Sequence, residues 1–260
     1  MRDERPTLLL LPGLLCDRAS WSPVLPALAA HAQCEVPDYS GESSLAAMAA
    51  RVLEHAPARF ALAGHSMGGR VALEVLRREP QRVTRLALLD TGYRGRPDGG
   101  AGDDERARRR ALLDLARRDG MRAMGREWMR AMVHPARLSD AALCEAILAM
   151  VERQTPDRYA AQIDALLGRP DVSALLRTIR VPTLVACGRD DAWSPLPQHE
   201  EIAALAPASR LVVFDDCGHM APMERPEAVA AALIDWLAAP SSAALAKDAA
   251  SRQAPRLAAG

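Results

Sequence analysis

The 260-residue sequence has no long apolar run and no excess of charge of either sign. A helix that spans a bilayer needs about 20 consecutive apolar residues, whereas the first apolar run covers only residues 8–11. That run is also too short for the apolar region of a signal peptide. The 33 basic side chains match 33 acidic ones, so no net field attracts nucleic acid or an anionic membrane. We therefore expect a cytoplasmic protein that binds neither.

Motifs for disulfides, metals and nucleotide cofactors are missing as well. The five cysteines are scattered, odd in number and without a Cys-x-x-Cys pair, which argues against a disulfide framework. His199-Glu200-Glu201 lacks the second histidine of a His-Glu-x-x-His zinc site. Neither a Gly-x-Gly-x-x-Gly nor a P-loop is present, and aromatic residues make up only 3%. We expect no cofactor and no metal, and the Ala-, Leu- and Arg-rich composition is typical of a GC-rich bacterial genome.

Short apolar runs alternate with amphipathic segments over the first third of the chain and again near its end. The predicted strands are residues 7–11, 60–63, 83–89, 182–187 and 211–214, with 35–38 as a weaker one. The predicted helices are residues 20–30, 43–55, a segment ending at Glu79, 197–205 and 226–237. Such alternation predicts an α/β fold with a doubly wound, mostly parallel sheet.

The alternation stops after Thr91, and only helical patterns follow, at about 104–118, 120–132, 139–153 and 156–167. We expect an all-helical cap over residues 94–178, inserted into an α/β core of residues 1–93 and 179–238. Residues 239–260 are an Ala/Ser-rich segment that we expect to be a flexible tail. The arginines at 106, 108, 109, 110, 117 and 118 alternate with acidic residues, which predicts a solvated helix face.

The most informative motif is Gly64-His65-Ser66-Met67-Gly68-Gly69, between a predicted strand and a predicted helix. A Gly-x-Ser-x-Gly at a strand-to-helix turn is a nucleophile elbow, which exposes the serine hydroxyl at the edge of the sheet. The N-terminus of the following helix can stabilise negative charge at the same place. The motif predicts Ser66 as a nucleophile. His65 is adjacent to the serine, but its position aims its side chain away, so we interpret it as a packing residue.

A serine hydroxyl needs a general base to react at neutral pH. His219 follows the last predicted strand, so it lies at the carboxyl edge of the sheet with the elbow. The base in turn needs a carboxylate that fixes its tautomer. Asp190 and Asp191 follow the penultimate strand and Asp90 follows an earlier one, so all three satisfy the order Ser…Asp…His.

The chain resembles the α/β-hydrolase superfamily, in its compact bacterial serine-esterase form with a helical cap. The matching pieces are Leu11-Pro12-Gly13-Leu14-Leu15 with Trp21, the elbow, Gly188-Arg189-Asp190-Asp191 with Pro195, and Gly218-His219 with Glu224-Arg225-Pro226. In that family the acid usually stands three residues after the loop glycine, so the resemblance implies Asp191. The chain starts at the family's third strand, so the resemblance also implies that the first hairpin is absent and that about six strands remain.

The resemblance further implies an oxyanion hole made of two backbone amides. One belongs to Met67, after the nucleophile, and the other to Leu14, with Leu15 as the alternative. Pro12 replaces the histidine that usually precedes Gly13. Backbone donors do not depend on that side chain, so we expect the hole to persist.

These features predict a cofactor-independent serine hydrolase with a Ser66, His219 and Asp191 triad, acting on a small-molecule carboxylic ester, thioester or lactone. A carbon–carbon bond hydrolase of the meta-cleavage-product type, a perhydrolase or a lyase on the same fold is an alternative. A ligand-binding sensor with slow turnover is a third. Methionine adapts to irregular shapes, so we expect an apolar acyl or alkyl group to pack in a pocket lined by Leu15, Trp128, Met129, Met132 and Met220. The oligomeric state is not predicted.

Overall fold

The computed structural model describes residues 5–240, so the expected tail lies outside the described residues from position 241 onward. Six strands of the described part form one sheet in the order β2-β1-β3-β4-β5-β6, and every neighbouring pair is parallel. The strands are β1 (Thr7–Leu11), β2 (Gln33–Glu35), β3 (Phe60–His65), β4 (Val83–Leu89), β5 (Thr183–Gly188) and β6 (Ser209–Phe214). The predicted α/β class and the six parallel strands are confirmed.

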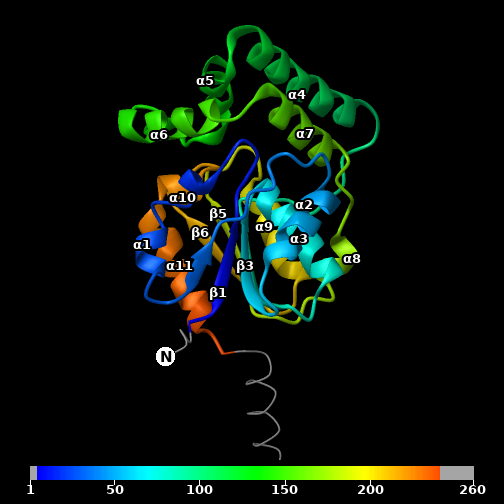
Figure 1. Ribbon diagram of the computed structural model, residues 1–260, viewed down its shortest axis with the longest axis vertical. Coiled ribbons are helices and arrows are strands. Elements are labelled where there is room, and N and C mark those ends of the chain that lie inside the picture. The colour runs from blue at the N-terminus through cyan, green and yellow to red at the C-terminus, as the bar shows by residue number, and fades with distance from the viewer. Residues whose placement is uncertain (1–4, 241–260) are drawn as a thin grey trace, which may run out of the picture.

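Helices cover both faces of the sheet (Figure 1). The helices α1 (Leu25–Leu28) and α11 (Pro226–Ala238) lie on one face, and α2 (Leu45–His55), α3 (Met67–Arg78) and α9 (Leu196–Leu205) lie on the other. Successive side chains of a strand point to opposite faces. In β1, Leu8 and Leu10 accordingly belong to the core cluster under α11, whereas Leu9 and Leu11 belong to the cluster under α2 and α3.

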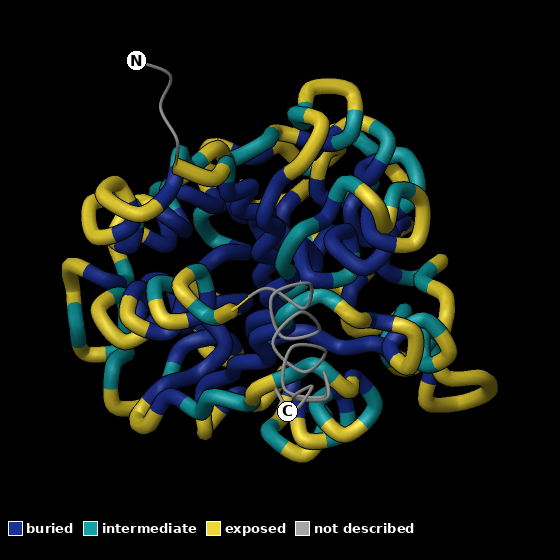
Figure 2. The backbone as a smooth tube through the Cα atoms, turned by 90° about the horizontal axis from the view of Figure 1, so that it is seen from below, coloured by how far each residue is buried: buried dark blue, intermediate teal, exposed yellow. Residues whose placement is uncertain are grey.

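A second group of helices lies between β4 and β5 in the sequence and over the carboxyl ends of the strands in space (Figure 1). We call it the helical insertion. It contains α4 (Gly99–Asp119), α5 (Met121–Met132), α6 (Ala141–Glu152) and α7 (Pro156–Leu167), with a 3-10 turn, η2 (Pro135–Arg137). The short α8 (Ser173–Leu176), which follows in the sequence, lies instead beside α9. Buried side chains of α4 to α7 continue the core cluster under α2 and α3. The tube in Figure 2 shows this buried interior surrounded by exposed outer segments.

Two predicted elements near the start of the chain were wrong in extent. The helix expected over residues 20–30 is a 3-10 turn, η1 (Arg18–Ser20), followed by the four-residue α1. Pro23 and Pro26 account for the break, because proline lacks an amide hydrogen and disfavours helical backbone in the residue before it. The strand expected over residues 35–38 is β2, which ends before Pro37, a residue that cannot donate to a ladder.

The carboxyl ends of the strands carry the segments that the sequence marks as functional. Ser66 follows β3, Asp90 follows β4, Asp191 comes after β5 and His219 after β6, with Gly13 after β1. Because parallel strands end at one edge of the sheet, these segments meet there. A short α10 (Ala221–Glu224) follows the histidine loop. Among residues 5–240, no helix is long and apolar enough to cross a membrane.

Candidate active site

Ser66 occupies the tight turn between β3 and α3 with a strained backbone of φ 54° and ψ −118°. Non-glycine residues rarely adopt positive φ, and such strain is concentrated at functional turns. The turn needs glycine on both sides. A Cβ atom on Gly64 would lie 2.3 Å from the Gly68 carbonyl oxygen, and one on Gly68 would lie 2.2 Å from the Leu11 carbonyl oxygen. The backbone of the elbow therefore holds the serine side chain outward at the sheet edge.

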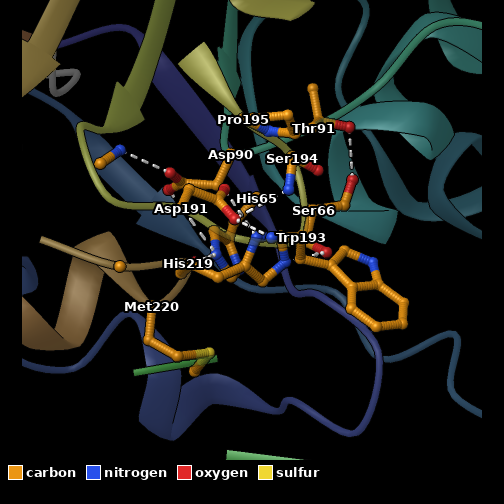
Figure 3. A network of polar contacts seen from close by, with 12 residues as sticks. His65, Ser66, Asp90, Thr91, Asp191, Trp193, Ser194, Pro195, His219 and Met220 are labelled. Carbon is orange, nitrogen blue, oxygen red and sulfur yellow. Dashed lines mark hydrogen bonds and ion pairs between the residues drawn. The ribbon is translucent and has the colours of Figure 1, made fainter. Parts of the chain in front are cut away.

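Three predicted site residues form one hydrogen-bonded chain (Figure 3). The Ser66 Oγ and His219 Nε2 atoms are 2.8 Å apart, and His219 Nδ1 is 2.8 Å from Asp191 Oδ2. Because a carboxylate only accepts, the His219 Nδ1–H donates to it, which leaves Nε2 to accept from the serine hydroxyl. The structure thus brings the predicted nucleophile, base and acid into sequential contact.

Asp191 is the carboxylate that His219 contacts, out of the three that the sequence left open. Its second oxygen, Oδ1, accepts the amides of Trp193 and Ser194, each at 2.8 Å. Burial alone would raise the pKa of Asp191, but His219 and the two amides overcome it and hold the pKa below its ordinary value. The exposed Asp190 instead lies with its Oδ2 3.4 Å from His134 Nε2.

His65 contacts the histidine loop through its side chain, without reaching the serine hydroxyl. Its Nε2–H donates to the backbone carbonyl of His219 at 2.7 Å. Burial, with the nearby His219 ring adding to it, lowers the pKa of His65 to about 3, so the ring is neutral at physiological pH. This geometry agrees with the packing role expected from the sequence, and it adds a direct link between the elbow and the His219 backbone.

A buried carboxylate fixes the backbone around His219. Glu224 is 1% exposed, and its side chain accepts the amides of Gly218, Met220 and His134 at 2.9–3.2 Å. The His219 amide itself donates to the Met132 carbonyl at 2.7 Å, at the end of α5. The histidine loop is therefore anchored from α10 and from the helical insertion.

The Ser66 backbone is held in a similar way from β4. The Thr91 hydroxyl donates to the Ser66 carbonyl at 2.6 Å, and the Thr91 amide donates to His199 Nε2 at 2.9 Å. His199 is fully buried, and burial lowers its pKa to about 4, so its ring stays neutral and can accept. The sequence assigned no role to His199 beyond its failure to complete a zinc motif.

The two amides predicted for an oxyanion hole lie beside the serine. A Cβ atom on Gly13 would lie 3.2 Å from Ser66 Cβ, so the loop that carries Leu14 packs directly on the elbow. In the part of the chain that the structure describes, the amides of Leu14 and Met67 donate to no protein acceptor. The alternative amide, that of Leu15, is already used, since it donates to Gln162 Oε1 at 2.9 Å. The geometry favours Leu14 over Leu15.

Gln162 joins this loop to the helical insertion. It lies on α7 and is 1% exposed, and its Nε2–H donates to the Ser40 carbonyl at 3.4 Å while its Oε1 accepts from Leu15. Leu15 has φ 62°, a conformation that needs support from its surroundings. Gln162 supplies that support from a segment almost 150 residues away, which the sequence analysis missed.

We expect Gln162→Leu to lower kcat on an ester by about tenfold, with a smaller change in KM. The loss should stay below the roughly 10²–10³ seen when an oxyanion donor is removed, because the Leu14 amide is displaced and not deleted. Steady-state kinetics would measure it, with Gln162→Glu, which keeps the acceptor, recovering part of the loss. Gln154→Leu is the control, because Gln154 is also buried but its Oε1 has no hydrogen-bond partner among the described residues. Equal losses in both leucine variants would contradict the positioning role.

A cavity of about 490 Å³ opens beside Ser66 and His219, under the helical insertion. Of the predicted pocket residues, Trp128, Met132 and Met220 line it, whereas Leu15 and Met129 are buried outside its lining. Cys16 also lines it, and burial followed by the charge of Asp17 raises the pKa of its thiol to about 12. That thiol therefore stays protonated at physiological pH.

The cavity also contradicts one expectation about the arginines on α4. Arg109 was assigned to a solvated face, but it is only 6% exposed and lines the cavity. Arg108 lines the cavity as well. One side of α4 packs against α7 and against Trp193. The alternation of basic and acidic residues in the sequence does not show which arginines lie on that side.

Comparison with known proteins places the chain in a family. Residues 8–232 match the model of the alpha/beta hydrolase family. The chain belongs to that family. This hydrolase is 29% identical over 246 residues to the pimeloyl-acyl-carrier protein methyl ester esterase of Aromatoleum aromaticum, in a match that covers 89% of this chain and 98% of the relative.

Two further proteins similar to this alpha/beta hydrolase are named as different enzymes, a synthase and an esterase. It is 28% identical over 248 residues to the 2-succinyl-6-hydroxy-2,4-cyclohexadiene-1-carboxylate synthase of Klebsiella pneumoniae, covering 90% of this chain and 94% of that one. The structure of a thermophilic esterase from Thermogutta terrifontis, solved with malate bound, is 30% identical, with a TM-score of 0.78 and 90% of each chain covered.

Asp90 is a second buried acid in the hydrolase, behind the hydrogen-bonded chain (Figure 3). It is fully buried, its Oδ1 accepts the Gly188 amide at 2.8 Å, and its Oδ2 has no hydrogen-bond partner among the described residues. Burial, followed by the negative charge of Asp191, raises the pKa of Asp90 well above its ordinary value. Asp90 therefore keeps its proton to higher pH than an ordinary aspartate does, whereas Asp191 loses its proton at lower pH than an ordinary aspartate.

This raised pKa predicts how stability depends on pH. Above the unfolded-state pKa of about 3.9 the unfolded chain releases the proton that the native Asp90 keeps, so this residue makes the native state less stable as pH rises, by up to about 1.4 kcal/mol per pH unit. Asp90→Asn removes that dependence. Urea unfolding in a pH series from 4 upward should show the variant gaining stability relative to wild type until the native pKa of Asp90 is passed. A difference that stays constant or shrinks from pH 4 upward would contradict a raised pKa of Asp90.

Proposed function

We propose that this hydrolase cleaves a carboxylic ester, thioester or lactone through an acyl-enzyme, with Ser66 as the nucleophile and without a cofactor. The observation that carries the proposal is the pair of 2.8 Å contacts from Ser66 to His219 and from His219 to Asp191. Two similar proteins are named as esterases, the relative from Aromatoleum aromaticum and the structure from Thermogutta terrifontis. They support an ester as the substrate.

In the proposed acylation step, Ser66 Oγ attacks the substrate carbonyl carbon while its proton passes to His219 Nε2. His219 becomes an imidazolium, which the carboxylate of Asp191 stabilises across the 2.8 Å contact. The two amides on the other oxygen keep that carboxylate oriented and ionised. The same imidazolium then gives its proton to the leaving oxygen or sulfur.

The tetrahedral intermediate carries an oxyanion, which the amides of Met67 and Leu14 would bind. Both lie beside Ser66, and preorganised donors at such a position supply a large part of the rate enhancement in acyl transfer. Water activated by His219 then attacks the acyl-enzyme and releases the acid. Each proton taken from serine or water in this cycle is accepted by His219 and returned to a leaving group.

We further propose that residues 94–178 act as a cap that selects the substrate. The helical insertion supplies Trp128 and Met132 to the cavity, and the histidine loop supplies Met220. These side chains can contact an apolar acyl or alkyl part, because the thioether of methionine adapts to irregular shapes. A volume of about 490 Å³ suits a small molecule.

A carbon–carbon bond reaction is a second candidate. It is favoured by the relative from Klebsiella pneumoniae, whose name is that of a synthase and not of an esterase. The same serine and histidine can serve either reaction, since one fold hosts many chemistries. Substrate profiling separates the two candidates.

The proposal is tested with p-nitrophenyl esters of two to eight acyl carbons. We expect turnover with a pre-steady-state burst of p-nitrophenolate, because the acyl-enzyme forms before it is hydrolysed. Turnover confined to a dienoic diketone would favour the carbon–carbon reaction. Tight ester binding without product release beyond the buffer rate would instead indicate a ligand-binding sensor, and either result would overturn ester hydrolysis.

A further inference from the structure

The cavity beside Ser66 carries an excess of positive charge that the ester chemistry does not use. Four arginines line it, together with a single glutamate that lies on α4: Arg70, Arg108, Arg109, Arg169 and Glu105. The charge of the whole chain is balanced, so this excess is local to the cavity. A buried charge is costly unless it is paired. Arg70, Arg109 and Arg169 therefore indicate which charge a bound substrate carries.

Glu105 is shared by two of the arginines and can neutralise only one of them. Its carboxylate lies 2.9 Å from Arg109 Nη2, and it accepts two bonds from Arg169 at 2.7 and 2.8 Å. All three side chains are no more than 13% exposed. Burial would raise the pKa of Glu105, but the two arginines overcome this and hold the pKa below its usual range, so the carboxylate is ionised. One guanidinium charge of this cluster remains uncompensated.

Arg70 adds a second uncompensated charge next to the nucleophile. It lies one turn after Ser66 on α3, and side chains of a helix lean toward its N-terminus, which here is the elbow. Its Nη1 donates to the Arg94 carbonyl at 3.0 Å, and within residues 5–240 it forms no ion pair with a carboxylate. Burial, followed by the charge of Arg169, lowers the pKa of Arg70 to about 9, which shows that its charge is costly in the free protein.

Arg109 connects this cluster to the acid side of the site. Its Cζ atom lies 5.3 Å from the centroid of the Trp193 ring, and the Trp193 amide is one of the two donors to Asp191. The Nε and Nη2 atoms of Arg109 contact Glu105, and its Nη1 has no hydrogen-bond acceptor within residues 5–240. The arginines therefore present donors to the same cavity into which Ser66 opens.

We propose that the substrate of this hydrolase carries a carboxylate besides its scissile ester, and that Arg70 and the Arg109–Arg169 pair bind that carboxylate. The inference rests on the proposed function for the scissile bond, but the binding of the carboxylate does not depend on it. Hydrogen bonds from arginine to a carboxylate are charge-assisted, and such bonds are the strong ones in a desolvated site. A half-ester of a dicarboxylic acid has this chemistry, with apolar methylene groups between its two ends.

The first test compares substrates that differ only in charge. Ethyl hydrogen succinate and ethyl succinamate have nearly the same shape, but the second has an amide in place of the carboxylate; the glutarate and adipate pairs extend the chain. We expect kcat/KM to be about tenfold higher for the half-ester of at least one pair, as one charge-assisted bond allows. Arg70→Gln should reduce this ratio to about two or less, mainly through KM of the half-ester.

Arg110→Gln is the matched control, because Arg110 is an exposed residue of α4 that does not line the cavity. The charged-to-neutral ratio should stay as in wild type in this variant. A wild-type ratio near or below one in all three pairs would overturn the inference while leaving ester hydrolysis intact. So would an equal fall of the ratio in the Arg70 and Arg110 variants.

The second test does not need turnover. Ser66→Ala removes the hydroxyl but keeps the arginines, so glutarate should raise the Tm of this variant and glutaramide should not. Added Arg70→Gln should abolish the shift. Stabilisation by inorganic phosphate equal to that by glutarate would overturn the assignment to a carboxylate. If glutarate binds but no ester is hydrolysed, the inference stands and the proposed function fails.

Discussion

Replacing Ser66 by alanine is expected to lower kcat on a p-nitrophenyl ester by about 10⁶-fold, the size of effect seen when the nucleophile of such a unit is removed. The hydroxyl oxygen is the atom that forms the acyl-enzyme. Among the described residues, His219 Nε2 is hydrogen-bonded only to this hydroxyl. Alanine keeps the backbone strain at φ 54° unchanged, so the fold should not change. Steady-state kinetics, with circular dichroism as a check on folding, would measure the loss.

Ser22→Ala is the control for this variant. Ser22 is exposed, and its hydroxyl donates only to the Arg18 carbonyl at 3.0 Å, so we expect activity within about twofold of wild type. Residual activity of Ser66→Ala above about 1% of wild type, without contamination by the parent enzyme, would mean that another group attacks the substrate.

Replacing Asp191 by asparagine is expected to lower kcat by about 10⁴-fold. The amide nitrogen would face His219 Nδ1 in place of the carboxylate oxygen, at the position now 2.8 Å away. The ring would then keep its proton on Nε2, the nitrogen that should accept from Ser66. Its imidazolium would also lose the charge that stabilises it. The loss should appear in kcat of the steady-state kinetics and much less in KM.

Two other aspartates provide controls that the sequence alone could not rank. Asp190→Asn alters an exposed side chain that faces His134, and Asp90→Asn alters a buried acid that does not contact His219 and whose pKa is raised. We expect the activity of both to exceed that of Asp191→Asn by at least about 10²-fold. A larger loss in either of them would transfer the role of the triad acid to that residue.

The sheet could be predicted from the sequence because each central strand is buried on both faces. Parallel strands under two helical layers read as continuous apolar runs, and residues 7–11 and 83–89 coincide with β1 and β4. The first helix could not be predicted well. A helix was predicted from residue 20, but α1 begins only at Leu25, because Pro23 precedes it and Pro26 lies in its first turn, where a missing amide donor is tolerated.

Ser66 and His219 could be found because each belongs to a short motif next to a strand end. The choice of Asp191 needed either the family resemblance or the structure, since Asp190 is its immediate neighbour. Gln162, Arg109 and Arg169 could not be predicted as parts of the site. Their positions depend on how α4 and α7 pack over the sheet edge, and no local pattern records a contact such as that of Gln162 with Leu15.

Labelling with a fluorophosphonate, read by peptide mass spectrometry, tests the central claim most directly. This reagent phosphonylates a serine that a neighbouring base activates, so the claim concerns one atom, Ser66 Oγ. We predict one adduct per chain on the peptide that contains Ser66, lost in the Ser66→Ala variant and strongly slowed in Asp191→Asn. An adduct on any other residue, or no adduct on Ser66 in the folded protein, would contradict Ser66 as the nucleophile.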